Sequence, residues 1–238
     1  MQAKFNLENI LFLDIETVPQ QPTFDKVSER MKELWAVKTM QRRKDNETPE
    51  EFYKSAGIFA EFGKIICISV GYFKMTKDGK TFRITSFSGD DEFMVLKDFF
   101  QLLNQHYNKK ESALCAHNGK EFDYPFLARR ALINGLKLPM VLDIAGSKPW
   151  ENQLLDTMEM WKFGDYKSYT SLVLLAAIFD IPTPKDDIDG TMVGGIYWKE
   201  RDLNRIVTYC QKDVLTVAQL FLRFQGEPLL EGEEINMV

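Results

Sequence analysis

Apolar residues in the first ninety positions recur in short runs that are typical of β-strands. Asn9 to Ile15 is the first run, Lys64 to Phe73 is the second, and Thr81 to Phe87 is the third. Between the last two, Lys77-Asp78-Gly79-Lys80 has the residues of a β-hairpin turn. Three strands in succession predict an antiparallel meander.

After the third strand, the spacing of apolar residues changes to three and four, which predicts a helix over Phe93 to Leu103. Acidic residues at 90–92 precede this helix, where they favour its N-terminal end. The other expected elements are a strand at Ala113 to Ala116, a helix from Tyr124 to Asn134, a strand at Leu154 to Met160, and helices at Ser171 to Phe179 and Leu203 to Phe224. This order predicts a mixed α/β sheet.

Residues 20–62 interrupt the strand pattern with a charged stretch. Within it, Thr48-Pro49-Glu50-Glu51 is typical of a helix start, so we expect a helix that runs to about Ala60. We expect one domain over residues 1–226, with residues 20–62 as an insertion, followed by an acidic tail at 227–238 that frays. We expect residues 187–202, which are rich in acids and glycines, to form a flexible loop.

The composition narrows the class of protein. Of the 238 residues, 45% are apolar, which fits a packed globular protein. No apolar run approaches the length of a membrane span, so no membrane partner is expected. The three cysteines are widely spaced and form no C-x-x-C pair, which favours reduced thiols and a cytoplasmic location.

The formal net charge of −5 argues against a nucleic-acid partner, whose phosphates attract Lys and Arg. Bound metal would weaken that argument. Two divalent ions would add about +4 and bring the total to roughly −1. Local charge therefore matters more than the sum.

Three segments carry acidic residues in patterns that suggest chemistry. Asp14 and Glu16 are two positions apart on a strand and so share one face, where they repel each other unless a cation lies between them. Asp123 stands at the start of a predicted helix, and Tyr209 and Asp213 share one face of the last helix. Each also has an ordinary explanation: a solvated strand end, a helix N-cap, and a surface tyrosine beside an acid.

Taken in order, these segments resemble the three motifs of the DEDD 3′-to-5′ exonucleases, in the subclass with the tyrosine motif Y-x-x-x-D. "FLDIETVP" and "NGKEFDYPFL" are similar to the proofreading domain of family-B DNA polymerases, and in particular to predicted stand-alone bacterial exonucleases related to it. "EFGKIICISVGYF" resembles the second strand of that group. The resemblance spans Leu11 to Gln219 and implies a ribonuclease H-like α/β fold with helices on both faces of the sheet.

The resemblance also implies a catalytic site with two divalent ions, Mg²⁺ or Mn²⁺. Asp14 would bridge both ions, Glu16 and Asp213 would complete the tighter site, Asp123 would hold the second ion through water, and Tyr209 would orient the attacking water. The chemistry is consistent with these residue types. Hydrolysis of a phosphodiester needs hydroxide and charge stabilisation, which paired divalent ions supply, and such ions prefer hard oxygen ligands.

By the same resemblance, Thr17, Asn118 and Phe122 would hold the 3′-terminal nucleotide. Phe122 could stack on a base or pack in the core. The expected substrate is a single-stranded DNA 3′ end, with RNA as an alternative, because ribonuclease D-type trimming enzymes use the same acids. A catalytically silent nucleic-acid-binding module is the other alternative, and an accessory role beside a polymerase or repair protein is compatible with the activity. The insertion could serve as a lid, a strand guide or a partner surface.

Overall fold

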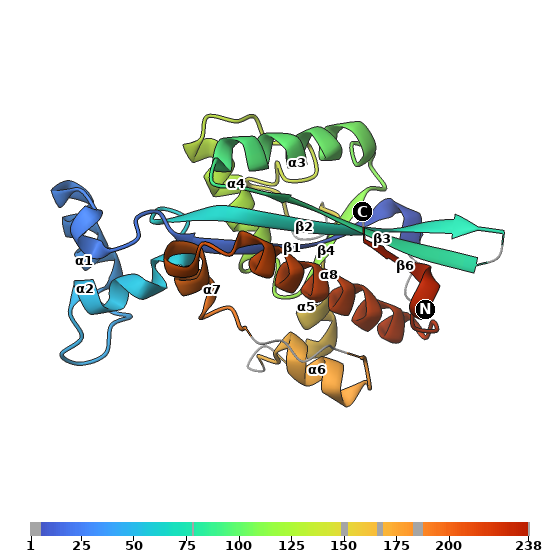
Figure 1. The fold of residues 1–238 in the computed structure, drawn as a ribbon. Helices are drawn as coiled ribbons and strands as arrows, with labels where there is room; N and C mark the ends of the chain where they lie inside the picture. Colours follow the sequence, from blue (N-terminus) through green and yellow to red (C-terminus); the bar gives the residue numbers. More distant parts are fainter. Residues whose placement is uncertain (1–5, 78, 149–151, 166–168, 183–187, 238) are drawn as a thin grey trace.

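A six-stranded mixed sheet forms the centre of the molecule in the computed structural model, which describes residues 6–77, 79–148, 152–165, 169–182 and 188–237 (Figure 1). The strand order is β5-β4-β1-β2-β3-β6. β1, β2 and β3 are antiparallel, while β4 and β5 continue in parallel from β1, and β6 is parallel to β3. The strands are β1 Ile10–Pro19, β2 Gly63–Thr76, β3 Gly79–Ser88, β4 Ala113–Ala116, β5 Leu154–Asp156 and β6 Ile235–Met237. The expected meander and mixed α/β sheet are confirmed.

Helices cover both faces of the sheet, as expected for a ribonuclease H-like fold. α3 and α4 lie on one face, and α5, α6 and α8 lie on the other (Figure 1). The helices are α1 Glu29–Thr39, α2 Pro49–Phe52, α3 Glu92–His106, α4 Asp123–Ile133, α5 Thr157–Lys162, α6 Leu172–Ile178, α7 Val193–Gly195 and α8 Leu203–Gln225. None of the helices in the described ranges is both long enough and apolar enough to cross a membrane.

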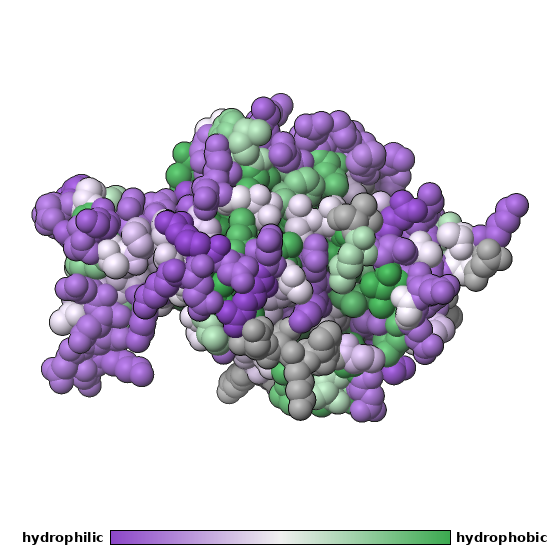
Figure 2. Space-filling model, viewed as in Figure 1, coloured by the Kyte–Doolittle hydropathy of each residue, from purple (hydrophilic) through white to green (hydrophobic). Residues whose placement is uncertain are grey.

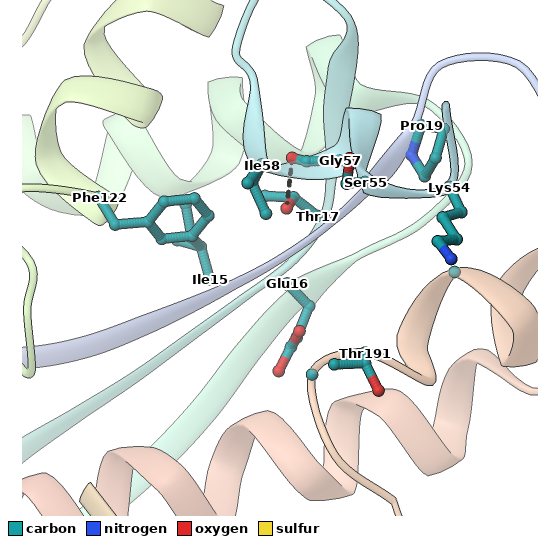
Figure 3. Close-up of a pocket in the computed structure, with 12 residues that line it drawn as sticks. Ile15, Glu16, Thr17, Pro19, Lys54, Ser55, Gly57, Ile58, Phe122 and Thr191 are labelled. Atoms are coloured by element: carbon teal, nitrogen blue, oxygen red, sulfur yellow. Dashed lines mark hydrogen bonds between the residues drawn. The ribbon is translucent and has the colours of Figure 1, made fainter. Parts of the chain in front are cut away.

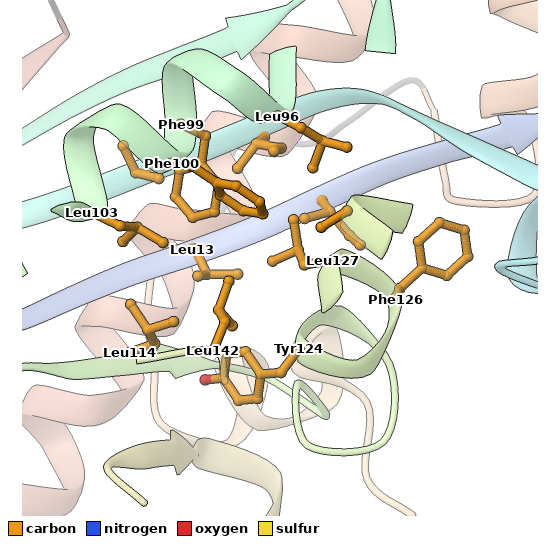
Figure 4. Close-up of a cluster of buried hydrophobic side chains, with 14 of the residues drawn as sticks. Leu13, Leu96, Phe99, Phe100, Leu103, Leu114, Tyr124, Phe126, Leu127 and Leu142 are labelled. Carbon is orange, nitrogen blue, oxygen red and sulfur yellow. The ribbon is translucent and has the colours of Figure 1, made fainter. Parts of the chain in front are cut away.

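β1 lies in the middle of the core and divides its side chains between the two faces. The odd-numbered Leu11, Leu13 and Ile15 belong to the apolar cluster under α3 and α4, part of which is drawn in Figure 4. The even-numbered Ile10 and Phe12 pack instead with side chains of α8. Because side chains alternate along a strand, the next even-numbered residues must also face α8.

The boundaries of several elements differ from expectation. β1 continues to Pro19, so its two acidic residues lie within the strand rather than at its end. The strand expected at 154–160 stops at Asp156, because the Asp156 carboxylate accepts hydrogen bonds from the main-chain N–H groups of Met158 and Glu159 and so starts α5. The acidic tail was expected to fray, and this expectation is wrong, since β6 pairs with β3. The hairpin joins β2 to β3 as predicted, although Asp78 of its turn lies outside the described residues.

The insertion, residues 20–62, projects from one end of the sheet (Figure 1) and has its own small core. Trp35 is fully buried among four aromatic rings, which belong to Phe52, Tyr53, Phe59 and Phe62. The helix predicted after Thr48 begins with a capping box, but it ends at Phe52 and continues as a 3-10 helix, Tyr53–Ile58. The sequence did not predict α1. Trp35 is the one large side chain that this helix buries, so its apolar residues show only a weak helical period. The visible surface of the insertion is largely hydrophilic (Figure 2).

A buried ion pair fixes the insertion to the main body. Arg130 of α4 donates from Nε and a terminal nitrogen to Glu92 of α3, at 2.8 and 2.5 Å. The other terminal nitrogen of Arg130 donates to the main-chain oxygen of Ala60 at 2.9 Å, and the Glu92 carboxylate also accepts from the N–H of Ile65 at 2.7 Å. One arginine therefore joins α3, α4 and the end of the insertion.

The segment before α8 was expected to be a flexible loop, and this expectation is wrong for residues 188–202; Asp187 lies outside the described residues. α7 and a π-helical turn, Ile196–Glu200, pack on β1 and β2 through Val193, Ile196 and Tyr197. Trp198 adds a hydrogen bond from its indole nitrogen to the Pro19 oxygen at 3.1 Å. The apolar residues of the segment are buried against the sheet, which orders it.

Candidate active site

Asp14 and Glu16 lie on the face of β1 that α8 covers, opposite Ser69 and Cys67 of β2. On that face, Ile10 and Phe12 of β1 belong to one apolar cluster, and Val18 belongs to another. Glu16 is only 7% exposed, and Figure 3 shows its side chain pointing from β1 toward Thr191. Two neighbouring carboxylates are thus held in a largely apolar gap between the sheet and a helix.

Two helices bring the remaining acidic residues to this gap. Asp123 is the first residue of α4 rather than its N-cap, which is Phe122. Its carboxylate is 3% exposed and accepts a hydrogen bond from the main-chain N–H of Ile15, so it lies beside β1. Asp213 lies one turn after Tyr209 on α8 and shares a hydrogen bond with it. The structure therefore brings together all five residues that the sequence singled out as catalytic.

The four carboxylates lie close enough together for Coulomb repulsion to raise the pKa values of three of them. Burial is the main cause that raises the pKa values of Asp14 and Glu16 well above their ordinary range, and Coulomb repulsion from Asp213 and Asp123 adds to it. Burial likewise raises the pKa of Asp123 to about 7. No lysine or arginine within the described ranges pairs with Asp14, Glu16 or Asp123 to offset this charge. Such an arrangement is costly unless a cation binds.

The donor set fits divalent metal ions. The Glu16 carboxylate is buried and forms no hydrogen bond or ion pair with any other described residue, so its oxygens are open to a ligand. Asp14 is next to it, and Asp123 and Asp213 add more carboxylate oxygens from two other elements. Hard oxygen ligands of this kind suit Mg²⁺ or Mn²⁺.

Tyr209 can act as a hydrogen-bond donor in this site. Burial raises the pKa of its hydroxyl far above the ordinary value, and the negative charges of Asp213, Glu16 and Asp14 add to the shift. The hydroxyl therefore keeps its proton over the whole physiological range. In this metal-free state it is a hydrogen-bond donor rather than a base.

Asn118 acts through the chain turn that presents Phe122 and Asp123. It has a positive φ of 60°, and its main-chain oxygen accepts from the N–H of Phe122 at 3.0 Å. Asp156 holds the same turn through the N–H groups of Asn118 and Lys120, both at 3.0 Å. Asp156 is 3% exposed and organises this turn. Asn118 does not line the pocket beside Glu16, although its Oδ1 atom is buried without a partner in the part of the chain that the structure describes.

A pocket of about 470 Å³ opens beside Glu16 (Figure 3). Phe122 lines one side of it and also packs on Phe126, with ring centroids 5.4 Å apart, so the expected packing is confirmed and base stacking stays a prediction. The insertion supplies another side, from which Lys54 extends toward the segment of Thr191. No sequence pattern marks Lys54 as a pocket residue, because its position depends on how the insertion folds back on β1.

Thr17 also lines this pocket, but its hydroxyl has a structural partner. Oγ1 donates to the main-chain oxygen of Gly57 at 2.8 Å and so joins β1 to the insertion. Cys210, predicted only to be a reduced thiol, lies against the carboxylates of the site, with Sγ 3.2 Å from Oδ2 of Asp14. Its position directly after Tyr209 in the chain was the available signal.

Comparison with known proteins identifies the family. A model of the family described as a predicted 3′-5′ exonuclease related to the exonuclease domain of PolB matches residues 58–233. The match includes Asp123, Tyr209 and Asp213, and it begins after the strand that carries Asp14 and Glu16. No curated protein matches the chain. More than half of the chain is matched, so this protein belongs to the family of predicted 3′-5′ exonucleases related to the exonuclease domain of PolB.

Proposed function

We propose that this protein is a metal-dependent exonuclease that hydrolyses phosphodiester bonds at the 3′ end of single-stranded DNA with two Mg²⁺ or Mn²⁺ ions. One observation carries the proposal: Asp14, Glu16, Asp123 and Asp213 converge with Tyr209, and no side-chain cation among the described residues balances the first three. The family assignment supports the same reaction.

Each residue of the site has a distinct task in this proposal. The bound ions supply hydroxide at neutral pH and neutralise charge that develops on the phosphate. Asp14, which the other three acids repel, would bridge the ions, Glu16 and Asp213 would hold the tighter one, and Asp123, at the start of α4, would hold the second through water. The Asp123 carboxylate also accepts from the Ile15 N–H, which keeps it oriented toward β1.

Once Asp213 binds an ion, the Tyr209 hydroxyl would turn from that carboxylate, donate its hydrogen bond to the attacking water and thereby aim it. We therefore expect Tyr209→Phe to lower kcat about a hundredfold, the cost of a misplaced reactant, with little change in KM. Because the pKa of Tyr209 lies far above the ordinary tyrosine value, the shape of the pH profile should be the same in both proteins between about pH 7 and 9. Single-turnover rates across that range test both points. A limb of the profile that disappears in the variant would assign proton removal to Tyr209.

The pocket would receive the terminal nucleotide. Its volume of about 470 Å³ lies in the range of small-molecule sites, and the Phe122 ring offers a face on which an unpaired base can stack. Lys54 brings a positive charge to the opposite side, where a phosphate of the strand could pass. This assigns the insertion a part in guiding the strand.

Thr17 would act on the nucleotide indirectly, by holding the insertion against β1. Thr17→Val removes the hydrogen bond to Gly57 with little change of shape, which costs about 1 kcal/mol. We expect KM for a short oligonucleotide to rise about fivefold, with kcat unchanged. Thr17→Ser keeps the hydroxyl and should retain the KM of the unaltered protein. A fall in kcat alone would instead place Thr17 at the reacting phosphate.

The decisive test is degradation of single-stranded DNA and RNA of one sequence, each labelled at the 5′ end, with Mg²⁺, Mn²⁺ or EDTA. A ladder that shortens from the 3′ end, that needs metal and that is faster on DNA would support the proposal. Faster shortening of RNA would make the protein an RNA-trimming enzyme. Binding of either strand without shortening would support the silent module and contradict the proposal.

A further inference from the structure

Cys210 is a fully buried thiol in direct contact with the proposed metal site. Its sulfur lies 3.2 Å from Oδ2 of Asp14 and 3.4 Å from the main-chain oxygen of the same residue. One ligand atom each from Asp14, Glu16 and Cys210 lie within 4.8 Å of one another. The site is therefore not built from oxygen alone, because a sulfur atom stands beside its central carboxylate.

The spacing of these three atoms suits a single metal ion. Zinc bonds of about 2.3 Å to sulfur and about 2.0–2.2 Å to oxygen place neighbouring ligand atoms roughly 3.5 Å apart. The Asp14 oxygen and the Cys210 sulfur are already at that separation. Glu16 supplies independent support, because its carboxylate is 7% exposed, points toward the pocket and has no hydrogen-bond partner among the described residues. It is free to turn to a metal.

We propose that Asp14, Glu16 and Cys210 form a thiophilic ligand set that binds Zn²⁺ or Cd²⁺ in place of the catalytic ions and stops hydrolysis. The metal–sulfur bond forms as the thiol proton leaves to water. Thiolate favours these soft ions strongly over Mg²⁺, and the fourth position of a tetrahedral site would open toward the pocket. Hydrolysis stops because Asp14, bound through this ion to Cys210, no longer bridges two ions. The inhibitory consequence, but not the binding, rests on the proposed function.

Cys67 is the main competitor for the role of sulfur ligand. It faces Glu16 across the β1–β2 pair and shares a sulfur hydrogen bond with Cys210. Its sulfur lies 3.6 Å from the hydroxyl of Ser69, the residue opposite Asp14, whereas the Cys210 sulfur contacts Asp14 itself at 3.2 Å. The geometry therefore favours Cys210, and variants of both thiols separate them.

Titration of the reduced, metal-free full chain with Cd²⁺ tests the binding directly, since cadmium–sulfur bonds absorb in the ultraviolet by charge transfer. We expect one equivalent of Cd²⁺ to produce the band, Cys210→Ser to remove it, and Cys67→Ser to retain it. Cys115→Ser is the matched control and should also retain the band, because Cys115 is a buried thiol within a separate apolar cluster. A band that survives in Cys210→Ser, or that disappears in Cys67→Ser, overturns the proposal, as does no band in a protein that binds Mn²⁺.

A second arm measures inhibition of hydrolysis by Zn²⁺ in excess Mg²⁺, with each variant compared with its own uninhibited rate. Half-inhibition of Cys210→Ser should need at least about tenfold more Zn²⁺ than the unaltered protein, because the strongest ligand is lost. If Zn²⁺ inhibits Cys210→Ser and the unaltered protein at the same concentration, the proposal that this ligand set stops hydrolysis is overturned. If no metal supports hydrolysis but the band depends on Cys210, the proposed function fails and the ligand set stands. If Mg²⁺ supports hydrolysis but no band forms, the ligand set alone fails.

Discussion

Asp14→Asn is expected to lower the rate of 3′-end hydrolysis by at least about a thousandfold, because it removes the carboxylate that would bridge both ions and thereby several kcal/mol of transition-state stabilisation. The same change is expected to make the metal-free protein more stable. Asp14 lies among Glu16, Asp213 and Asp123, all of which raise its pKa, so its charge opposes folding when no cation is bound. Function and stability should therefore change in opposite directions.

The pH dependence gives this prediction a definite sign. A carboxyl whose pKa is raised in the folded state destabilises the protein above that pKa, and the destabilisation fades as the pH falls toward the ordinary carboxyl pKa. Burial raises the pKa of Asp123 to about 7, and those of Asp14 and Glu16 are also well above normal. In EDTA, the advantage of Asp14→Asn over the unaltered protein should thus be absent near the ordinary carboxyl pKa of about 4 and grow as the pH rises.

Thermal unfolding in EDTA at several pH values, together with the oligonucleotide assay in Mg²⁺, measures both effects. Asp98→Asn is the matched control, because Asp98 is an exposed acid on α3 far along the chain from the site. It should change neither quantity. Near-normal hydrolysis by Asp14→Asn would refute the two-ion assignment, and a lower stability of this variant in EDTA at high pH would refute the electrostatic account of the site.

Arg130→Ala is expected to have the largest effect on stability, with a loss of about 3–5 kcal/mol in the free energy of unfolding. Arg130 and Glu92 are 4% and 7% exposed, and their ion pair is supported by hydrogen bonds to the main chain at Ala60 and Ile65. Removal of the guanidinium leaves the Glu92 charge buried and unpaired, which is far more costly than loss of an exposed ion pair. Denaturant unfolding measures the difference.

Arg129→Ala is the natural control, since Arg129 is the exposed neighbour of Arg130 on the same helix, and its loss should stay within about 0.5 kcal/mol. The double variant Arg130→Met with Glu92→Gln should recover part of the stability, because it removes both charges and keeps an oxygen for the Ile65 N–H. Equal losses from Arg129→Ala and Arg130→Ala would show that the buried pair does not stabilise the fold.

Much of the fold could be predicted because its signals are local. The hairpin turn, the apolar period of α3 and the same-face spacing of Tyr209 and Asp213 each depend on neighbours in the chain. The insertion was predicted poorly for the same reason. α1 buries one large side chain, Trp35, whose partners come from α2 and the residues after it, so its sequence lacks the strong period of an amphipathic helix.

The sequence by itself determined which side chains the proposed site would contain: four acids and Tyr209, with Asp14 and Glu16 on one face of a strand. Only the tertiary structure decided what surrounds them. The contact of Cys210 with Asp14, the bond from Thr17 to Gly57, and the support of Asn118 by Asp156 each join residues far apart in the chain. Such contacts depend on strand order and on how α8, the insertion and α5 pack on the sheet, and spacing along a sequence fixes which face a residue occupies but not which residue lies opposite.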